Sequence, residues 1–250
     1  MALSDAQLDR YVRQIVLREL GGAGQQQLLE SSVVVIGAGG IGSPAIQYLA
    51  AAGVGNLTIV DDDRVDLSNL QRQTLYGTGE VGHLKADLAK RKVEMLNPDV
   101  AVDISAIRVD AANARCLMEG AAVVLDGSDN FETRLAVADA AHAAHVPLVS
   151  ASVAQFEGQL AVYRGWEPDK PCYRCFVGSD PDRPEASCSE QGVLGPAAGV
   201  MGSLAAMEVI RALTGFGEDS AGKLLLMDGL GLRFRTVKLP KDPECPACKA

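Results

Sequence analysis

The sequence has few aromatic residues, and we expect no membrane-spanning segment in it. Aromatic side chains make up 4% of the 250 residues whereas 26 residues are glycine, a balance common in α/β proteins with tight strand-to-helix turns. The uncharged stretch at residues 191–207 is rich in Gly, Pro and Ala and too short to span a bilayer. Residues 1–14 carry acids and arginines where a signal peptide has an apolar core. We therefore expect a soluble, cytoplasmic protein without membrane association.

Positive charge and histidine are also scarce. Lys and Arg number 23 against 32 Asp and Glu, and the formal net charge is −9 at pH 7. Because Lys and Arg are needed to neutralise a phosphate backbone, this balance argues against nucleic acid as a partner. The three histidines offer no obvious Ser–His–Asp or Cys–His pairing. We interpret His142 and His145, three residues apart in a helical pattern, as ordinary helix residues rather than metal ligands.

Apolar, β-branched segments alternate with helical patterns up to about residue 155. The apolar segments cover residues 33–36, 57–60, 100–107, 122–125 and 148–152. The helical patterns between them cover residues 43–53, 83–98, 111–121 and 131–145. Such alternation predicts an α/β fold with a doubly wound, mostly parallel, Rossmann-like sheet covered by helices on both faces.

The pattern changes in the last third of the chain. Later strands, which we expect to be antiparallel, are indicated at residues 158–164, 223–230 and 232–239. A helical pattern at 196–215 ends on Gly215, a residue suited to a C-cap. Because no repeat or low-complexity linker divides the chain, we predict a single domain over residues 1–250.

A glycine-rich loop follows the first predicted strand directly. Gly37, Gly39 and Gly42 spell G-x-G-x-x-G before a helical pattern, and Gly40 adds one more glycine. These glycines permit a tight turn and let backbone N–H groups approach a phosphate at the positive end of a helix. Asp61 closes the second strand about 20 residues on, where an acid can accept hydrogen bonds from a ribose. The motif alone does not choose among NAD, FAD and ATP, and glycines that serve only close packing are the alternative reading.

The residues after Asp61 favour ATP. Asn69, Arg72 and Lys85 follow the second strand and come before or at the start of the next helical pattern. A dehydrogenase holds only a bridging pyrophosphate and has little use for two more cations here. A triphosphate whose β- and γ-phosphates must be held during transfer does need them.

Acidic and amide side chains also end the fourth predicted strand. Asp126, Asp129 and Asn130 lie where ligands of open α/β sheets bind, and Asp129 could bind the magnesium ion that accompanies ATP. Each candidate has a plain structural alternative: Lys85 as a solvated helix residue, Asp129 as an N-cap, Arg72 as a surface ion pair. Their convergence on one edge of the sheet favours the functional interpretation.

Four of the six cysteines form two C-x-x-C pairs, Cys172 with Cys175 and Cys245 with Cys248. Two such pairs suit a tetrahedral structural zinc, and nothing else in the chain resembles a thioredoxin. The long gap between the pairs predicts that the metal staples the C-terminal segment to a distant one, outside the catalytic chemistry. Cys116 we interpret as a buried helix residue.

Together these motifs resemble those of the ubiquitin-activating superfamily, and more narrowly its short bacterial MoeB/ThiF family. The resemblance covers nearly the whole chain and rests on RYVRQ at 10–14, GAGGIG at 37–42, SNLQRQ at 68–73, Lys85 and DGSDN at 126–130. It implies an ATP-dependent adenylyltransferase that activates the C-terminal glycine carboxylate of a ubiquitin-like sulfur-carrier protein ending in Gly-Gly, MoaD- or ThiS-like, and releases pyrophosphate.

The resemblance also implies roles for individual residues. Asp61 would hold the ribose, Asn69, Arg72 and Lys85 would contact the phosphates, and Asp129 would bind Mg²⁺. The full set of implied nucleotide contacts is Gly37, Gly39, Gly40, Gly42, Asp61, Asp63, Ser68, Asn69, Leu70, Gln71, Arg72, Lys85, Asp129 and Asn130. The family's corresponding cysteines bind zinc, which agrees with the interpretation of the two C-x-x-C pairs.

Two further residues acquire roles only through the resemblance. Arg13 matches an arginine that family members insert into the active site of a partner subunit, which implies a homodimer with shared sites. Its alternative is a charge on an amphipathic helix. Cys188 matches a cysteine that some members use in sulfur transfer and others do not need, so any role would follow adenylation.

The resemblance divides the domain into a helical arm at 1–30, a nucleotide-binding core at 31–155, and a carrier-binding, zinc-stapled part at 156–250. We favour molybdopterin biosynthesis as the pathway, with a ThiF-type enzyme acting on a thiamine or other sulfur carrier as the alternative. Outside this class, the rival hypotheses are an NAD-dependent dehydrogenase, for which no proton-relay residue is evident, and a non-catalytic binding subunit.

Overall fold

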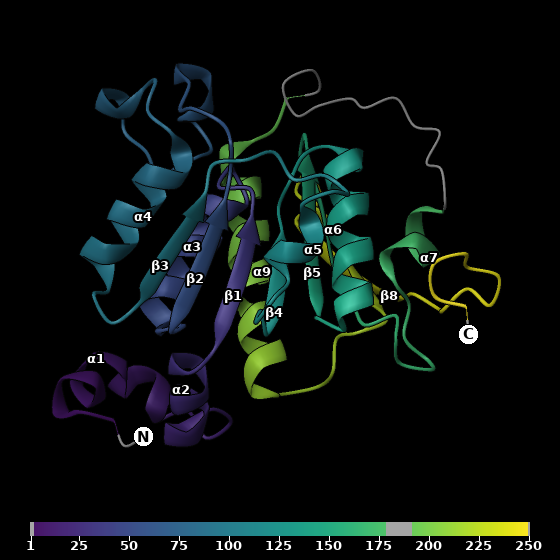
Figure 1. The fold of residues 1–250 in the computed structure, drawn as a ribbon, viewed down its shortest axis with the longest axis horizontal. Coiled ribbons are helices and arrows are strands. Elements are labelled where there is room, and N and C mark those ends of the chain that lie inside the picture. The colour runs from purple at the N-terminus through teal and green to yellow at the C-terminus, as the bar shows by residue number, and fades with distance from the viewer. Residues whose placement is uncertain (1–2, 179–191, 250) are drawn as a thin grey trace.

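An eight-stranded sheet organises the protein in the computed structural model, which describes residues 3–178 and 192–249 (Figure 1). Its strand order is β3-β2-β1-β4-β5-β6-β7-β8. The first five strands in this order pair in parallel, and β6, β7 and β8 each pair antiparallel with the strand before them. The strands are β1 (Ser32–Ile36), β2 (Asn56–Val60), β3 (Ala101–Ser105), β4 (Val123–Asp126), β5 (Leu148–Ala154), β6 (Glu157–Tyr163), β7 (Lys223–Asp228) and β8 (Arg233–Lys238). The predicted change from parallel to antiparallel pairing is confirmed.

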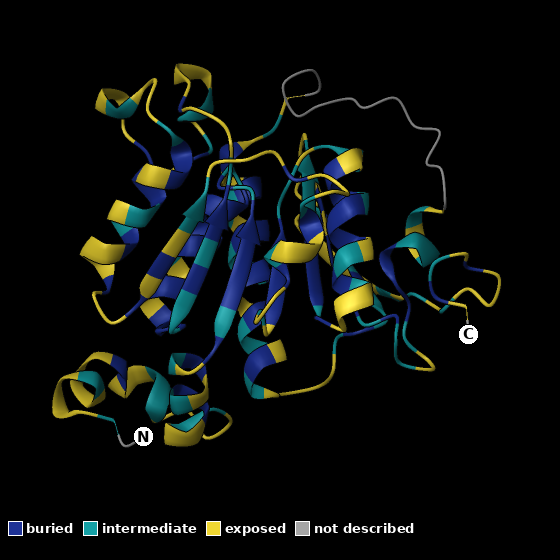
Figure 2. Ribbon diagram, in the orientation of Figure 1, coloured by how far each residue is buried: buried dark blue, intermediate teal, exposed yellow. Residues whose placement is uncertain are grey.

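Helices cover both faces of this sheet, as the alternating pattern predicts. They are α1 (Asp5–Ile15), α2 (Gly21–Leu29), α3 (Gly42–Ala52), α4 (Lys85–Leu96), α5 (Ala114–Leu117), α6 (Phe131–Ala144), α7 (Tyr173–Val177) and α9 (Gly195–Thr214), with short 3₁₀ turns η1 (Leu67–Asn69) and η2 (Thr78–Glu80). Helices α3, α4 and α9 share one apolar core with the sheet, and α5, α6 and α7 share the other. Figure 2 shows the central strands buried between these layers and the outer helix faces exposed. Strand β8, at the edge, is exposed along most of its length.

Two details differ from the sequence predictions. The apolar segment at 100–107 forms a strand only as far as Ser105, and the helical pattern at 111–121 contracts to the four residues of α5. The interpretation of Cys116 as buried is wrong, because its side chain is exposed. The short helix turns Ala114 and Met118, one helical repeat apart, toward the core, so a residue halfway between them faces solvent.

Helix α9 is long and apolar enough to cross a membrane by length and composition alone, and is the one such helix among the described residues. In this fold it packs against α3, β5 and β6, with Met201 and Ala205 fully buried. Gly202 lies so close to the carbonyl oxygen of Ile41 that a Cβ there would sit 2.3 Å away. The predicted C-cap at Gly215 is confirmed, with a φ of 72°.

The N-terminal helices lie at the amino ends of the strands, opposite the edge where the glycine loop emerges (Figure 1). A capping box at Ser4 and Gln7 starts α1. Tyr11, 1% exposed, anchors the helix against Gly53 and accepts a 2.8 Å hydrogen bond from the Asn97 side chain. Gly53 must be glycine here because its φ is 84° and a Cβ would lie 2.6 Å from the tyrosine ring.

Tyr11 should therefore contribute a large share of the stability of this corner. Replacing Tyr11 with Ala should lower the free energy of unfolding by about 3–5 kcal/mol, since a large buried ring is removed. Tyr11→Phe keeps the ring, and the Asn97 amide still donates to the Ala50 carbonyl at 2.7 Å, so its cost should be only about 1 kcal/mol. Urea unfolding of both variants checks this, and equal costs would contradict the packing argument.

Candidate functional site

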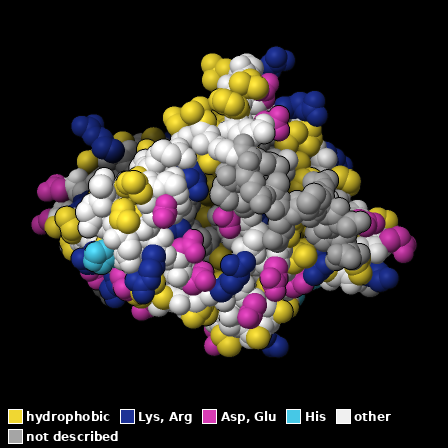
Figure 3. Space-filling view, turned by 90° about the horizontal axis from the view of Figure 1, so that it is seen from above, with side chains coloured by type: hydrophobic (Ala, Val, Ile, Leu, Met, Phe, Trp, Pro, Cys, Tyr) yellow, Lys and Arg dark blue, Asp and Glu magenta, His cyan; other side chains and the backbone are white. Residues whose placement is uncertain are grey.

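A cavity lies at the point where the strand order reverses. The chain leaves β1 for β2 and β3 on one side and returns to β4 on the other, which opens a crevice at the carboxyl ends of the strands. A cavity of about 580 Å³ occupies this crevice, bordered by the glycine loop and by the segments that follow β2 and β4. Figure 3 looks down on this edge, where acidic and basic side chains are interspersed. The cavity brings together ten of the site residues predicted from the sequence: Gly37, Gly39, Gly40, Asp61, Asp63, Asn69, Arg72, Lys85, Asp129 and Asn130.

The glycines of the loop have separate structural tasks. Gly37 has a φ of 85°, and a Cβ on it would lie 3.2 Å from the backbone of Gly127. A Cβ on Gly42 would lie 1.9 Å from the carbonyl oxygen of Gly37, so these two glycines shape the turn. Gly40 lets Arg72 and the start of α9 approach the loop closely. Gly39 faces the cavity, and among the described residues a Cβ on it would have one side chain, that of Gln73, within 4 Å. The backbone at Gly39 is therefore open to a ligand.

Asp61 ends β2 and fastens the glycine loop from the side. Its carboxylate accepts hydrogen bonds from the backbone N–H of Ala38 at 2.7 Å and of Asp63 at 2.9 Å. Burial raises the pKa of Asp61, although the nearby Lys85 ammonium and the two N–H groups act in the opposite direction. The carboxylate lines the cavity, where a ligand hydroxyl can donate to it.

Lys85 is the first residue of α4, and its side chain is only 4% exposed. Its ammonium donates to the Asp63 carboxylate at 2.7 Å, whereas the Asp63 side chain is 67% exposed. The hydroxyl of Tyr76 donates to the Ala38 carbonyl at 2.9 Å and holds the neighbouring backbone in place. The buried cation thus has a solvent-facing counterion that an incoming anion can replace.

The segment after β2 contributes unevenly to the cavity. Asn69 and Arg72 line it, and the Arg72 guanidinium donates to the Ser68 carbonyl at 3.1 Å. Ser68, Leu70 and Gln71 from the same predicted set do not line it, nor does Gly42. Gln71 instead presents its carbonyl to Gly195 at the start of α9, where a Cβ would lie 2.1 Å away. Direct contact with a ligand in the cavity is therefore left, among the predicted residues of this segment, to Asn69 and Arg72.

The loop between β4 and α6 presents Asp129 to the cavity. The buried carboxylate of Asp126 accepts hydrogen bonds from the Ser128 N–H at 2.9 Å and its hydroxyl at 2.6 Å. The side chain of Asn130 caps α6 by accepting from Thr133 N–H at 2.9 Å. The capping role considered for Asp129 therefore falls to Asn130. Asp129 is exposed at the cavity wall, where an oxygen ligand for a hard cation would be needed.

Several polar cavity residues were absent from the sequence predictions, among them Gln73, Arg108 and Arg134. Gln73 is buried and ends the same SNLQRQ segment that carries Asn69 and Arg72. Arg108 follows β3, the next strand end along the sheet edge. Arg134 lies four residues after Asn130, so it shares a helix face with that cap, which is the signal that could have located it.

One predicted residue lies away from the cavity, and another falls outside the described part of the chain. Arg13 is exposed on α1, at the amino ends of the strands, and does not line the cavity of its own chain. Cys188 lies outside the described residues.

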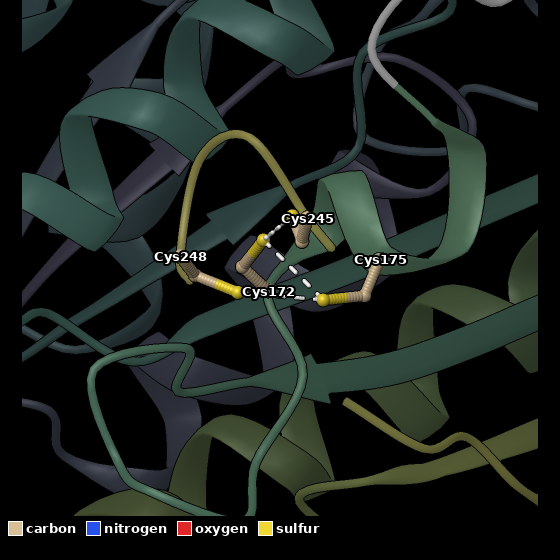
Figure 4. A group of neighbouring side chains, drawn as sticks. All are labelled: Cys172, Cys175, Cys245 and Cys248. Carbon is tan, nitrogen blue, oxygen red and sulfur yellow. Dashed lines mark hydrogen bonds between the residues drawn. The ribbon is translucent and has the colours of Figure 1, made fainter. Parts of the chain in front are cut away.

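The four cysteines of the two C-x-x-C pairs gather at one point, although they are far apart in the sequence (Figure 4). All are free thiols, and their sulfurs lie within 4.8 Å of one another. The Sγ–Sγ distances are 3.8 Å for Cys172 to Cys175, 3.6 Å for Cys172 to Cys245, and 3.4 Å for Cys175 to Cys248. A tetrahedral zinc with bonds of about 2.3 Å spaces its sulfurs by about 3.8 Å. The cluster is therefore compatible with zinc, and it lies apart from the cavity residues.

Comparison with known proteins finds one family by sequence and a shared fold by structure. The ThiF family model matches residues 11–247. The SAMP-activating enzyme E1 of Haloferax volcanii is 45% identical over 252 aligned residues, 99% of this chain and 91% of the relative. The molybdopterin-synthase adenylyltransferase of Escherichia coli is 42% identical over 246 residues, 98% of each chain. The crystal structure of E. coli MccB with ATP has a TM-score of 0.82 at 23% identity, covering 96% of this chain and 75% of that one, and shows a shared fold.

The loop geometry predicts different effects for two of its glycines. Gly42→Ala should lower the free energy of unfolding by about 1–3 kcal/mol or more, because the methyl group would meet the Gly37 carbonyl oxygen. Gly39→Ala is the matched control, since its nearest neighbour would be Gln73 Nε2 at an ordinary 3.6 Å. Chemical denaturation measures both. Comparable losses from the two substitutions would mean that close backbone approach does not shape this loop.

Proposed function

The chain belongs to the ThiF family, and from this premise we propose that it is an ATP-dependent adenylyltransferase for a ubiquitin-like sulfur-carrier protein. The observation that carries the proposal is the convergence of Asp61, Arg72, Lys85 and Asp129 on one cavity beside an open glycine loop. The family gives no support to the dehydrogenase alternative. The retention of all four residues argues against a non-catalytic subunit. We place the protein in the cytoplasm.

In this proposal ATP lies along the crevice with its phosphates over the glycine loop. Asp61 accepts hydrogen bonds from the ribose hydroxyls, in keeping with its place at the end of β2. Lys85 exchanges its contact with Asp63 for a phosphate oxygen, while Asn69 and Arg72 hold the phosphates from the other wall. Asp129 would hold Mg²⁺, which supplies positive charge at the phosphate oxygens when bound.

The reaction requires charge neutralisation rather than a general base. A C-terminal glycine carboxylate has a pKa of roughly 3.5 and is ionised at neutral pH. One of its oxygens bonds to the α-phosphorus of ATP as the bond from that phosphorus to the bridging oxygen breaks, and pyrophosphate leaves. Arg72 and Lys85 stabilise the negative charge that builds on the phosphates and hold them in line with the attacking carboxylate.

We infer that Arg13 acts in the site of a partner subunit. It is exposed on α1, at the edge of the sheet opposite the cavity, so it does not serve the cavity of its own chain. A homodimer in which each α1 faces the partner's cavity would supply a further cation to each site. This arrangement gives Arg13 a role outside its own chain, while Tyr11 of the same RYVRQ segment packs within it.

The cysteine cluster is proposed to hold a structural zinc. Its sulfur spacing fits a tetrahedral ion, and it joins residues 172–175 to the segment at 245–248. Within the single domain we assign residues 1–30 to the arm, 31–155 to nucleotide binding and 156–250 to carrier binding and stapling. Any role of Cys188 belongs to sulfur transfer after adenylation.

The carrier is proposed to be a MoaD-like protein of molybdopterin biosynthesis, with a ThiS-like carrier as the alternative. The molybdopterin-synthase and ThiS adenylyltransferases of E. coli are each 42% identical to this chain, along 98% and 97% of their own lengths, so identity does not separate the two carriers. The paired C-x-x-C motifs and the chain length favour the first choice. The SAMP-activating relative, at 45%, has a different carrier in its name. Pyrophosphate exchange with a panel of purified carriers decides between them.

Removing either phosphate-binding cation should slow adenylation strongly. Arg72→Ala and Lys85→Ala should each reduce carrier-dependent pyrophosphate exchange roughly a hundredfold, because each contact strengthens as charge builds on the phosphates. Asp129→Ala should abolish the exchange through loss of the metal. The wild type should bind Mg·ATP and show negligible NAD affinity, both measured by calorimetry.

Two substitutions serve as controls for this experiment. Lys90→Ala removes a cation from the same helix as Lys85 but outside the cavity, and should leave exchange unchanged. Cys188→Ala should stay within a few-fold of wild type, a change of roughly 1 kcal/mol in the barrier. Tight NAD binding without ATP binding, or exchange eliminated by Cys188→Ala in a folded protein, would overturn the proposal.

The zinc assignment has its own test. The purified protein should contain about one zinc ion per chain. Cys248→Ser should lower zinc content and melting temperature together, by several degrees, since about 1 kcal/mol corresponds to roughly 2–4 °C at this size. Cys116→Ser, at the exposed cysteine of α5, should change neither quantity. Unchanged stability in a zinc-free Cys248→Ser protein would remove the stapling argument.

A further inference from the structure

A buried tyrosine lies behind the glycine loop without lining the cavity. Tyr76 is 7% exposed, and its ring belongs to the apolar core that the sheet shares with α3, α4 and α9. Its hydroxyl donates to the carbonyl oxygen of Ala38 at 2.9 Å, and the carbonyl oxygen of Lys85 lies 3.4 Å away. Because a hydroxyl carries one proton, the shorter distance assigns it to Ala38. Tyr76 thus reaches the glycine loop from the segment after β2.

The Ala38 carbonyl is one end of a peptide unit whose other end faces the cavity. This C=O and the N–H of Gly39 belong to the same planar trans peptide, so they point in opposite directions. The carbonyl points toward buried hydroxyls, and the N–H of Gly39, a residue that lines the cavity, therefore points away from them. Among the described residues, none accepts a hydrogen bond from this N–H. The orientation of one peptide unit thus decides whether a donor is presented to a ligand.

Two further contacts hold this part of the loop. The hydroxyl of Ser43, a fully buried residue at the start of α3, also donates to the Ala38 carbonyl, at 3.3 Å. The N–H of Ala38 donates to the Asp61 carboxylate at 2.7 Å. The bond from Tyr76 is the shorter of the two to the carbonyl, so we assign it the larger share. A donor to a carbonyl also polarises the peptide, which makes the N–H of Gly39 a stronger donor.

The surroundings keep the hydroxyl of Tyr76 protonated. Burial raises the pKa of Tyr76, and the nearby carboxylates of Asp61, Glu80 and Asp63 raise it further. The hydroxyl therefore stays a donor at neutral and moderately alkaline pH. A phenylalanine ring would fill the same space but would leave the Ala38 carbonyl to Ser43 alone.

We propose that Tyr76 is a positioning residue of the nucleotide site, whose hydroxyl orients the peptide between Ala38 and Gly39 so that the Gly39 N–H meets a phosphate oxygen. The inference rests on the proposed function, in which the phosphates of ATP lie over the glycine loop. Tyr76 touches no reacting atom and acts through the backbone of the loop. It gives the site a neutral donor, beside the cations Arg72 and Lys85, whose direction is set before the nucleotide arrives.

The first arm of the test compares two buried tyrosines. Tyr76→Phe and Tyr11→Phe each keep the ring and lose one hydrogen-bonded hydroxyl, so each should lower the melting temperature by a similar amount, about 2–4 °C. Only Tyr76→Phe should weaken Mg·ATP binding, by about three- to tenfold in calorimetry, the factor that corresponds to one net hydrogen bond. Adenosine, which lacks phosphates, should bind the wild type and both variants alike.

Two further readouts separate positioning from a loss of stability. In carrier-dependent pyrophosphate exchange, Tyr76→Phe should raise KM for ATP by about the same factor and change kcat little, because the contact is made before the reaction as well as during it. In the free protein, the backbone amide of Ala38, which donates to Asp61, should exchange with solvent about three- to tenfold faster. Tyr11→Phe should leave both quantities unchanged.

The second arm removes the other donor to the same carbonyl. Ser43→Ala deletes the longer bond and should weaken Mg·ATP binding less than Tyr76→Phe does. Removing both hydroxyls leaves the buried Ala38 carbonyl without a donor among the described residues, so the loss in the double variant should exceed the product of the two single losses. A loss no larger than that product would show that the hydroxyls do not act through one peptide, and would overturn the assignment.

The outcomes separate this inference from the proposed function. A wild type that binds no Mg·ATP would contradict the proposed function, and the exchange rate of the Ala38 amide would then decide whether Tyr76 holds the loop. Wild-type affinity for Mg·ATP in a folded Tyr76→Phe protein would overturn the positioning role. An equal loss of affinity for adenosine, or an equal loss for Mg·ATP in Tyr11→Phe, would do the same.

Discussion

The close approach of backbone to backbone around the glycine loop is the constraint on which the rest of the structure depends. Gly42 lets α3 begin against the Gly37 carbonyl, and Gly202 and Gly195 let α9 lie directly on the carbonyls of Ile41 and Gln71. Three segments distant in sequence are thereby packed without side chains between them. The crevice at the strand ends keeps its shape because the backbone segments behind it are packed directly on one another.

Charge is distributed around this rigid frame so that each candidate group is held by another before any ligand arrives. Asp61 is fastened by two N–H groups, Lys85 by Asp63, and the loop carrying Asp129 by Asp126 and Arg134. Such preorganisation lets a site stabilise developing charge without rearranging at the moment of reaction. Stability and reactivity here use the same contacts.

Much of this was readable in the sequence, for physical reasons. The spacing of apolar residues and the turn glycines identified every parallel strand. The positions of Asp61, Lys85 and Asp129 after strand ends predicted that they lie at one cavity, as they do. Arg134 escaped because a helix arginine looks solvated until the β5 carbonyls arrive from another part of the chain. Cys116 was misjudged because the length of α5 is decided by tertiary packing rather than by the local pattern.

The exposed edge strand β8 has a consequence for how the protein behaves at high concentration. An open edge offers unpaired N–H and C=O groups on which a second copy could add its own strand. Along β8 these groups are flanked by Arg233, Arg235 and Lys238, all exposed. Two copies brought edge to edge would set like charges against each other, so the sheet resists growing into a fibre although its last strand is uncovered.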